Sequence, residues 1–245
     1  MPPRLFVEAP LSPGAMVDLP PNASRHVQVL RLQPGDALTL FDGRGGQWQA
    51  VVAEMGRKAV SARVQAVEDH EAELPLAVTL ACGMPANERM DTLVEKATEL
   101  GAAAIAPLVT ARSVLRVAGE RADRKAQHWQ AIAQAACEQC GRNRVPPVAA
   151  PQPLADWLAR PLPAGHAGLV LSLDPAAPPL GRWLTGQAAP PAGLVLLSGP
   201  EGGLAPHELE AAQHAGYQPV SLGARVLRAD TAPLAALAII ADRAA

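Results

Sequence analysis

The sequence predicts two domains, a small β-barrel followed by an α/β domain with a mainly parallel sheet. Short runs of alternating apolar and polar residues fill the chain from Arg4 to about Val67. Residues 68–75 are acidic and end in proline, which is typical of a linker. Beyond Leu76, strand-like and helical patterns alternate. A chain of 245 residues, 49% of them hydrophobic, is long enough to bury two cores.

The predicted N-terminal domain, residues 1–73, contains four short strand-like runs, RLFV, ALTLFD, QWQAVVAE and AVSARVQAV. Turn residues separate these runs at 32–36, 42–46 and 55–58. The DGRGG segment at 42–46 lies between two runs, so we interpret it as a hairpin turn and not as a dinucleotide-binding fingerprint. One brief helix is expected between Ala23 and Leu30. A small β-barrel is the natural packing for so many short strands.

The predicted C-terminal domain, residues 74–245, begins with the strand-like segment AVTLACG and a helix from Glu88 to Leu100. Apolar residues recur along that helix at helical spacing, and Gly101 stands where a helix-terminating glycine belongs. The segments AAIAPLV, GLVLSLD and GLVLLSG predict three further strands. A basic helix from about Asp123 follows the first of them, and a final helix ends the chain. This alternation predicts the parallel sheet.

Charge and hydropathy exclude two broad classes of protein. The net charge of −2 and the pI near 6.3 argue against a protein that coats nucleic acid indiscriminately. No apolar run reaches membrane length, because the longest, at 232–241, contains Pro233, and the first ten residues lack a signal-peptide core. We therefore expect a cytoplasmic protein without membrane contact.

Seven basic residues and only three acidic residues lie between positions 112 and 144. Such a cluster predicts either a surface that contacts RNA phosphates or ordinary solvated charges. The seven residues are Arg112, Arg116, Arg121, Arg124, Lys125, Arg142 and Arg144.

Cys137 and Cys140 form a C-x-x-C pair, a pattern that also occurs in zinc and redox sites. Zinc needs two more ligands, and Cys82 is the only other cysteine in the chain. The pair lies at the end of the predicted basic helix, whereas redox thiols usually lie where a helix begins. We therefore expect reduced thiols that pack in the structure, and no metal.

Near the C-terminus a buried strand, Leu194 to Leu197, leads into the glycine-rich segment SGPEGG and then into a helix that begins near Pro206. Glycines there allow backbone N–H groups to approach a ligand closely, and the helix directs its positive end to the same place. An ordinary α/β unit also turns a corner in this way. Both interpretations, ligand loop and plain connection, stay open on this pattern alone.

Five segments occur in one order along the chain: RHVQVLRLQPGD, ERMDTLVEKATELGA, ACEQCGRNRVP, SGPEGGLAPHEL and LGARVLRADTAPLAAL. Together they resemble the RsmE family of 16S ribosomal RNA uridine-N3 methyltransferases, within the SPOUT superfamily. The resemblance implies a PUA-like β-barrel RNA-binding domain over 1–73 and a trefoil-knotted SPOUT methyltransferase domain over 74–245. It also implies S-adenosylmethionine as methyl donor, 16S rRNA of the small ribosomal subunit as partner, and a homodimer.

The resemblance also assigns residues around the cofactor, whose adenosine would be held mostly by backbone groups of deep loops. Each apolar member of this set has core packing as its alternative. The set is Leu173, Leu197, Gly199, Leu222, Gly223, Val226 and Leu227.

Uridine N3 carries a proton, so its methylation needs a base and stabilisation of negative charge on the flanking carbonyl oxygens. Candidates for stabilising the charge are Arg142, Arg144 and Arg228. Candidates for the base are Glu138 and Asp230, although Asp230 or Thr231 could instead cap the last helix and Glu138 could pair with Arg142. RNA contacts are expected from Arg25, Arg31, Arg112 and Arg144.

Two other functions stay open: a SPOUT methyltransferase that acts on transfer RNA or another ribosomal position, and a catalytically silent RNA-binding relative. The aromatic content of 3% is low for a protein that binds RNA by base stacking, which slightly disfavours the silent relative. Ala205 stands where a serine would cap the helix, and we expect Pro206 and Glu208 to offset part of that loss.

Overall fold

The computed structural model describes residues 2–57, 59–86, 88–115 and 117–244, so Arg116 of the basic cluster at 112–144 lies outside the described residues. The chain forms two compact units. The first contains residues 1–73 together with 134–145, and the second contains 74–133 together with 146–245. The sequence expected all of 74–245 to form one domain, whereas residues 134–145 pack with the N-terminal unit.

The N-terminal unit is built on a five-stranded sheet in the order β1-β3-β4-β5-β2. β1 and β3 are parallel and the remaining neighbours are antiparallel. β1 and β2 form the edges of the sheet as described, so the expected β-barrel is an open half-barrel. Its elements are β1 (Arg4–Phe6), β2 (Met16–Asp18), α1 (Pro21–Val29), β3 (Ala37–Phe41), β4 (Gln47–Met55) and β5 (Val60–Glu68).

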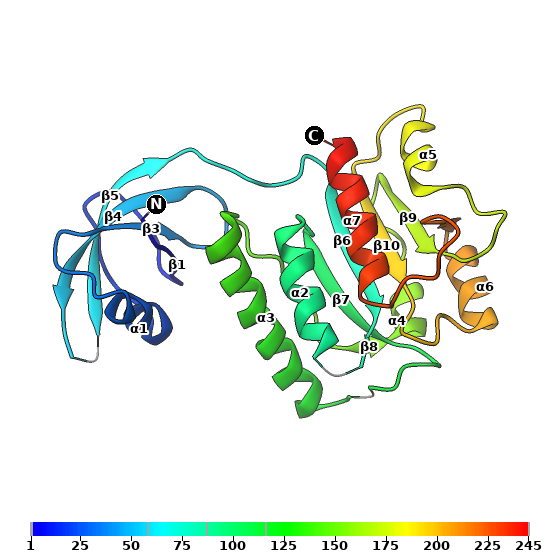
Figure 1. The fold of residues 1–245 in the computed structure, drawn as a ribbon, viewed down its shortest axis with the longest axis horizontal. Helices are drawn as coiled ribbons and strands as arrows, with labels where there is room; N and C mark the ends of the chain where they lie inside the picture. Colours follow the sequence, from blue (N-terminus) through cyan, green and yellow to red (C-terminus); the bar gives the residue numbers. More distant parts are fainter. Residues whose placement is uncertain (1, 58, 87, 116, 245) are drawn as a thin grey trace. The chain divides into compact units, whose positions relative to one another are not determined.

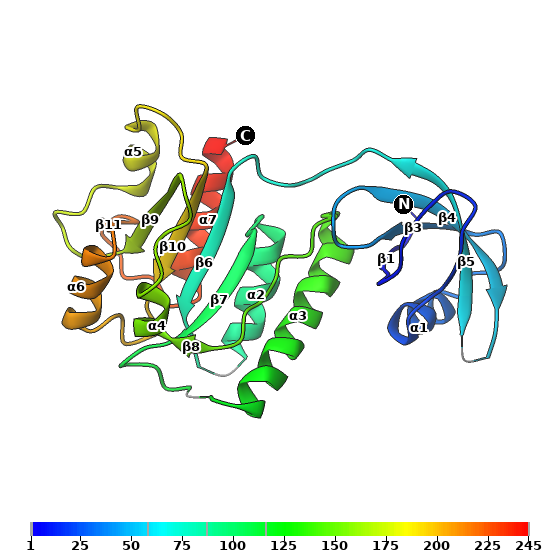
Figure 2. The same cartoon turned by 180° about the vertical axis from the view of Figure 1, so that it is seen from behind.

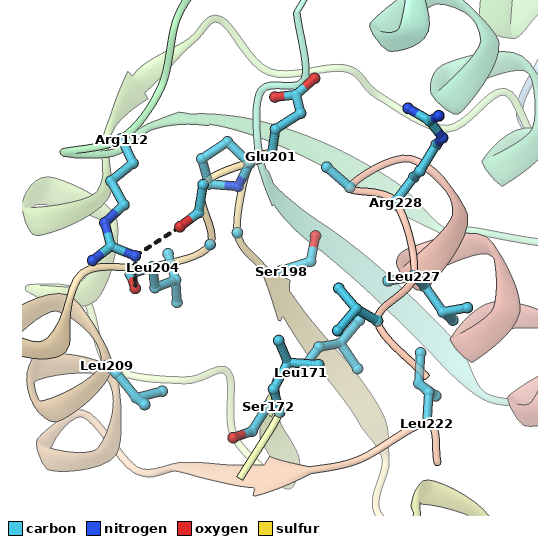
Figure 3. Close-up of a pocket in the computed structure, with 18 of the residues that line it drawn as sticks. Arg112, Leu171, Ser172, Ser198, Glu201, Leu204, Leu209, Leu222, Leu227 and Arg228 are labelled. Carbon is cyan, nitrogen blue, oxygen red and sulfur yellow. Dashed lines mark hydrogen bonds between the residues drawn. The ribbon is translucent and has the colours of Figure 1, made fainter. Parts of the chain in front are cut away.

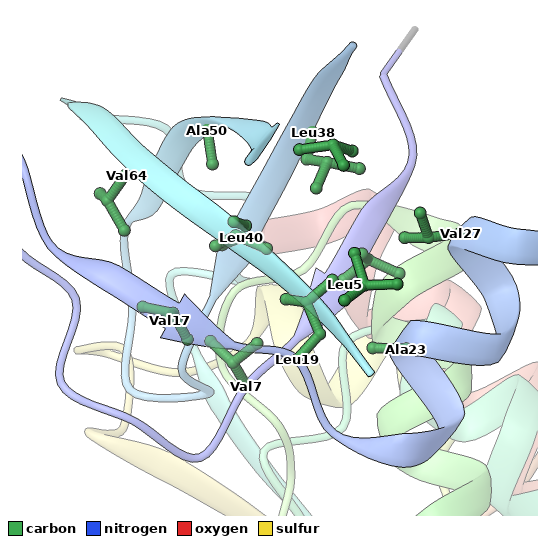
Figure 4. Close-up of a cluster of buried hydrophobic side chains, with 13 residues drawn as sticks. Leu5, Val7, Val17, Leu19, Ala23, Val27, Leu38, Leu40, Ala50 and Val64 are labelled. Atoms are coloured by element: carbon green, nitrogen blue, oxygen red, sulfur yellow. The ribbon is translucent and has the colours of Figure 1, made fainter. Parts of the chain in front are cut away.

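A hydrophobic core fills the space between the inner face of this sheet and α1 (Figure 4). Leu5, Leu40 and Val27 are completely buried in it. β3 and β4 form the expected hairpin, with Leu40 opposite Trp48. The turn contains Gly43 and two further glycines at positive φ, which confirms its interpretation as a hairpin turn.

Residues 134–145 complete the N-terminal unit through backbone and side-chain hydrogen bonds. The Arg4 guanidinium donates to Asn143 Oδ1 at 2.7 Å and to the Arg142 carbonyl oxygen at 3.2 Å. Gly45 N–H donates to the Asn143 carbonyl oxygen at 3.2 Å, and Val145 N–H donates to that of Gly43. The ACEQCGRNRVP segment up to Val145 is therefore part of the N-terminal unit's structure.

The second unit contains a six-stranded sheet in the order β11-β9-β10-β6-β7-β8, and all five pairings are parallel. The predicted parallel α/β sheet is confirmed. All six residues of β10 are buried, as expected for a central strand covered on both faces. The strands are β6 (Ala77–Gly83), β7 (Ala104–Val109), β8 (Gln152–Pro153), β9 (His166–Leu171), β10 (Gly193–Ser198) and β11 (Tyr217–Val220).

Helices cover both faces of this sheet (Figures 1 and 2). α2 and α7 lie on one face, and α4 and α6 lie on the other, where they enclose a second hydrophobic cluster. None of the helices in the described ranges is long and apolar enough to span a membrane. The trefoil threading of the chain stays a prediction. The helices are α2 (Arg89–Glu99), α3 (Glu120–Cys140), α4 (Leu154–Leu158), α5 (Leu180–Thr185), α6 (Pro206–His214) and α7 (Thr231–Ala244).

Local signals set the helix ends. Gly101 adopts φ +91° directly after the C-cap of α2 and donates its N–H to the Thr98 carbonyl oxygen, so the expected stop is confirmed. α3 begins at Glu120, three residues before the position expected from the apolar spacing. The apolar spacing could not place the start, because the two residues that open α3, Glu120 and Arg121, are exposed.

The three cysteines are free thiols. Burial raises the pKa of Cys137 and that of Cys82 to about 12. The Cys137 thiol donates to the Arg144 carbonyl oxygen at 3.6 Å. At neutral pH both buried thiols are therefore protonated and poorly reactive.

A buried indole joins α2 to α3 through Asp91, a first-turn residue of α2. Asp91 accepts from Trp129 Nε1 and pairs with His128 Nε2, both at 2.9 Å. Burial alone would raise the pKa of Asp91, but the hydrogen bonds from His128 and Trp129 outweigh it and hold the pKa below its usual range. The pair therefore stabilises the fold while Asp91 is charged.

We predict that Asp91→Asn lowers the free energy of unfolding by on the order of 1 kcal/mol at pH 7, because it removes a charge-assisted bond and a favourable helix-start charge. The folded pKa of Asp91 lies below the unfolded value of about 4. Its stabilisation is thus present above pH 4 and is lost as the pH falls through the folded pKa. Denaturant unfolding at several pH values should show the difference between wild type and variant shrinking below pH 4. The exposed Asp123→Asn is the control, and a pH-independent difference would contradict the prediction.

Candidate functional site

A cavity of about 670 Å³ lies at the carboxyl edge of the parallel sheet. Three connections line it: residues 171–174 after β9, 198–204 after β10, and 222–229 after β11 (Figure 3). These connections meet because parallel strands deliver their carboxyl ends to one edge of a sheet, the usual ligand position in α/β folds. The volume falls within the range of about 300–1,000 Å³ that small-molecule sites occupy.

The glycine-rich connection after β10 is folded tightly against its own backbone. A Cβ on Gly199 would lie 2.7 Å from the Gly203 carbonyl carbon and the Leu204 nitrogen. A Cβ on Gly83, at the end of β6, would lie 2.5 Å from Pro200 Cδ. The sequence suggested that glycine here leaves room for a ligand. The structure gives a different reason for these two glycines, because the nearest atoms belong to the chain itself.

Two carboxylates tie this connection to neighbouring segments. Glu201 Oε1 accepts from Ala86 N–H at 2.9 Å and lies 3.7 Å from Arg89 Nη1. The buried Glu208 accepts from Ala111 N–H at 2.7 Å and from Ala205 N–H at 2.8 Å. Ala205 cannot cap α6 with its own side chain, so Glu208 satisfies this end of the helix, as its position in the first turn suggested.

The cavity combines apolar walls with polar groups. Leucines form much of the wall, and at its edge Leu173 and Val226 remain 69% and 78% exposed. Ser198 is 2% exposed, and its Oγ has no hydrogen-bond partner among the described residues. A buried hydroxyl without a partner costs free energy unless a ligand or water satisfies it.

These features fit S-adenosylmethionine, the cofactor that the sequence resemblance implies. An adenine ring needs apolar walls, which the leucines supply. A ribose and an amino-acid tail need hydrogen-bonding groups, which the backbone of three loops and the unsatisfied Ser198 hydroxyl can offer. The residues present can hold the cofactor without a charged fingerprint.

Six of the seven predicted cofactor residues line the cavity: Leu173, Gly199, Leu222, Gly223, Val226 and Leu227. Leu197 is the exception. It is completely buried in the cluster that α4 and α6 form with the sheet, and it is not a lining residue. Its side chain packs in the core, which was the alternative given for each apolar member of the set.

The catalytic candidates are divided between the two units. Arg228 lines the cavity, and its side chain is exposed with no hydrogen bond or ion pair among the described residues. Arg142 belongs to the N-terminal unit, where its side chain is 3% exposed and bound by the Glu73 carboxylate through Nε at 3.1 Å and Nη2 at 2.5 Å. The structure gives Glu73 as a partner of the guanidinium, and the suggested pairing of Arg142 with Glu138 stays a prediction.

Glu138 is also engaged within the N-terminal unit. Its Oε1 accepts from Phe6 N–H at 2.9 Å. Burial raises the pKa of Glu138, and the hydrogen bond from Phe6 opposes this only in part. Its role as base stays a prediction. Asp230, the other candidate, directly follows the lining residue Ala229, and its Oδ1 is buried without a partner among the described residues.

The predicted RNA-contacting arginines lie in different settings. Arg25 and Arg31 are exposed on and just after α1. Arg144 is exposed, and its backbone N–H donates to Glu73 Oε1 at 3.3 Å. Arg112 instead lines the cavity in the second unit and is hydrogen-bonded to the glycine-rich connection.

Sequence reasoning missed several polar lining residues: Arg89, Ser172, Asp174, Ser198, Glu201 and Arg225. Five of these end a strand of the sheet or lie in the connection that follows one: Ser172 and Asp174 after β9, Ser198 and Glu201 at and after the end of β10, and Arg225 after β11. Their position just beyond parallel strands was the available signal, since that edge collects ligand-binding side chains.

Two protein families match the chain. The family described as "RNA methyltransferase domain" matches residues 72–241, and the family described as "RNA methyltransferase PUA domain" matches residues 19–65. Among curated proteins, ribosomal RNA small subunit methyltransferase E of Synechocystis sp. is 39% identical over 213 residues, covering 87% of this chain and 68% of that protein. The protein of the same name from Bacillus subtilis is 31% identical, covering 87% and 84%.

Two solved structures with bound cofactor are similar over nearly the whole chain. Ribosomal RNA small subunit methyltransferase E from Neisseria gonorrhoeae, bound to S-adenosylmethionine, superimposes with a TM-score of 0.89 at 36% identity and covers 97% of this chain and 96% of that one. A putative methyltransferase from Legionella pneumophila, also in complex with this cofactor, gives 0.89 at 34% identity and covers 98% and 97%. The chain belongs to the ribosomal RNA small subunit methyltransferase E family, whose members are S-adenosylmethionine-dependent rRNA methyltransferases.

Proposed function

We propose that the chain methylates ring nitrogen N3 of a uridine in 16S rRNA of the small ribosomal subunit. The observation that carries this proposal is the cavity at the carboxyl edge of β9, β10 and β11, in a chain whose structural relatives hold S-adenosylmethionine. The names of the curated relatives support the small-subunit substrate. The sequence resemblance supports uridine N3.

The cavity residues hold the donor. The side chains of Leu222 and Leu227 offer an apolar surface for its adenine ring, and the Ser198 hydroxyl offers a hydrogen bond within the cavity. When bound, the cofactor supplies an electrophilic methyl group on a sulfonium centre. The chain's task is then to place a uracil ring against that group and to exclude competing nucleophiles.

Arg228 stabilises the reacting uracil. The N3–H group must lose its proton, and negative charge then spreads onto the two flanking carbonyl oxygens. The Arg228 side chain is at the cavity and engaged by none of the described residues, so its planar guanidinium is available to those oxygens. Asp230 is the better candidate for the base, because its buried Oδ1 has no partner among the described residues, whereas Glu138 already accepts from Phe6 N–H.

The N-terminal unit binds the RNA in this proposal. Arg31 supports it, because it adopts φ +57°, a left-handed conformation that costs an arginine about 1 kcal/mol or more relative to glycine. We infer that the Arg31 side chain, exposed at a position where glycine would be less strained, contributes to RNA binding. Arg25 is exposed on α1, six residues before it.

A homodimer is also proposed, on the family resemblance. Sedimentation equilibrium over a hundredfold range of protein concentration measures it directly. A mass that stays at that of one chain, 25.4 kDa, would contradict it.

Methyl transfer from labelled donor tests the function. Purified protein is incubated with small ribosomal subunits, naked 16S rRNA or bulk transfer RNA, and incorporation is compared. Methylation at N3 blocks Watson–Crick pairing, so primer extension should stop one nucleotide before the modified uridine. Labelled transfer RNA would favour the transfer RNA alternative, a product without a primer-extension stop would favour another ring position, and donor binding without any transfer would favour the silent relative.

We predict that Gly199→Ala weakens S-adenosylmethionine binding at least about tenfold, a loss of about 1.4 kcal/mol. The added Cβ would meet backbone atoms of Gly203 and Leu204 at 2.7 Å, so the connection has to shift away from its binding geometry. Titration calorimetry measures the affinity. Gly181→Ala is the matched control, since an added Cβ there meets no atom within 4 Å. Unchanged affinity in a folded Gly199 variant would remove this connection from the site.

We predict that Arg228→Ala lowers the single-turnover methylation rate at saturating RNA and donor by on the order of tenfold to a thousandfold, because charge on the uracil oxygens loses its partner. Donor affinity should stay within about twofold. Arg160→Ala, an exposed arginine of the same unit, is the control. If donor affinity falls in step with the rate, Arg228 orders the loop and does not stabilise the reaction.

A further inference from the structure

Arg112 reaches across the cavity edge to the glycine-rich connection after β10. Its Nη1 donates to the Gly202 carbonyl oxygen at 2.7 Å and to the Leu204 carbonyl oxygen at 3.4 Å. Figure 3 shows its side chain extended along this connection, with the guanidinium at the loop backbone. The two carbonyls flank Gly203, which adopts φ +68°, so the guanidinium bridges a left-handed turn.

The stem of Arg112 also packs on the connection. A Cβ on Gly202 would lie 3.1 Å from Arg112 Cβ and 3.3 Å from its Cδ, so this glycine is in close contact with the aliphatic part of the side chain. The preceding residue, Ala111, donates its N–H to Glu208 at 2.7 Å. The segment after β7 is therefore bonded both to the connection and to the start of the helix that follows it.

The opposite side of the connection is held by Glu201, through Ala86 N–H and Arg89. Residues 199–204 thus have anchors in two segments that come from elsewhere in the chain. A cofactor loop that is already ordered does not have to be ordered by its ligand, and this raises affinity. Of the two anchors, Arg112 alone bonds to backbone carbonyls on both sides of the turn.

We propose that Arg112 is a positioning residue for the cofactor site: it holds the 199–204 connection in its binding conformation and does not contact RNA phosphate. This inference rests on the proposed function, since it assumes that the connection binds S-adenosylmethionine. It replaces the sequence-based expectation that Arg112 grips phosphate. A guanidinium bound to two carbonyls would have to give up both bonds to turn toward a phosphate.

Three variants separate positioning from phosphate binding. Arg112→Ala removes both the bonds and the charge, whereas Arg112→Lys keeps the charge but replaces a planar fork with a single ammonium group. Arg31→Ala is the positive control for a phosphate contact. Arg160→Ala is the matched control, an exposed arginine of the same unit with no side-chain bond among the described residues.

The measurements are donor affinity by calorimetry, RNA affinity as a function of salt, single-turnover rate and thermal midpoint. Arg112→Ala should weaken donor affinity about tenfold and leave the salt slope of RNA binding unchanged, and Arg112→Lys should recover part of the affinity. At saturating donor the single-turnover rate should return to within about twofold of wild type, a recovery that general loss of structure would not give. Arg31→Ala should reduce the salt slope by about one while donor affinity stays constant.

Wild-type donor affinity in Arg112→Ala, together with a salt slope reduced by about one, would overturn the inference and restore the phosphate role. If the alanine variant does not fold, Arg112→Lys decides: a folded lysine variant with full donor affinity overturns the inference. Wild-type protein that binds no donor contradicts the proposed function itself. Wild-type binding that Arg112→Ala leaves intact contradicts only the role of Arg112.

Discussion

The parallel alignment of β9, β10, β11 and β6 is the constraint on which the rest of the second unit depends. Leu197 pairs with Val170 on one side and with Ala81 on the other, and this register brings the ends of these strands to one edge. Only there can loops separated by tens of residues surround one cavity. The same alignment buries β10 on both faces, so its six residues are all apolar, small or hydroxyl-bearing.

A loop at such an edge has to be compact and still leave its backbone polar groups satisfied. The connection after β10 folds on itself at Gly199 and against β6 at Gly83, where a Cβ would strike backbone atoms or a proline ring. Hydrogen bonds to other segments then satisfy its polar groups. The Arg112 guanidinium donates to two of its carbonyl oxygens, and the Glu201 carboxylate accepts from the backbone just before α2. A compact turn cannot hydrogen-bond all of its own carbonyl groups. The close packing of this connection therefore depends on hydrogen bonds from segments distant in sequence.

Sequence patterns predicted the elements whose signals are local. The DGRGG hairpin, the helix stop at Gly101 and the run into SGPEGG each depend on residues within one turn of the feature. What they could not predict depends on contacts distant in sequence, such as Glu73 with Arg142, 69 positions apart, or Arg112 with Gly202, 90 apart. Leu197 shows a second limit. A strand buried on both faces has no alternation that tells a cavity-facing side chain from one in the core.

Contacts distant in sequence also distinguish the arginines from one another, which the sequence alone could not do. Arg142 is buried against Glu73, and Arg112 bonds two carbonyls; moving either toward a substrate would break bonds already made. Arg225 and Arg228 line the cavity, and the described residues engage neither side chain. In the proposed reaction, charge on the uracil would therefore be met most readily by the arginines of the loop after β11, because their guanidinium groups would exchange water, and not protein partners, for the substrate.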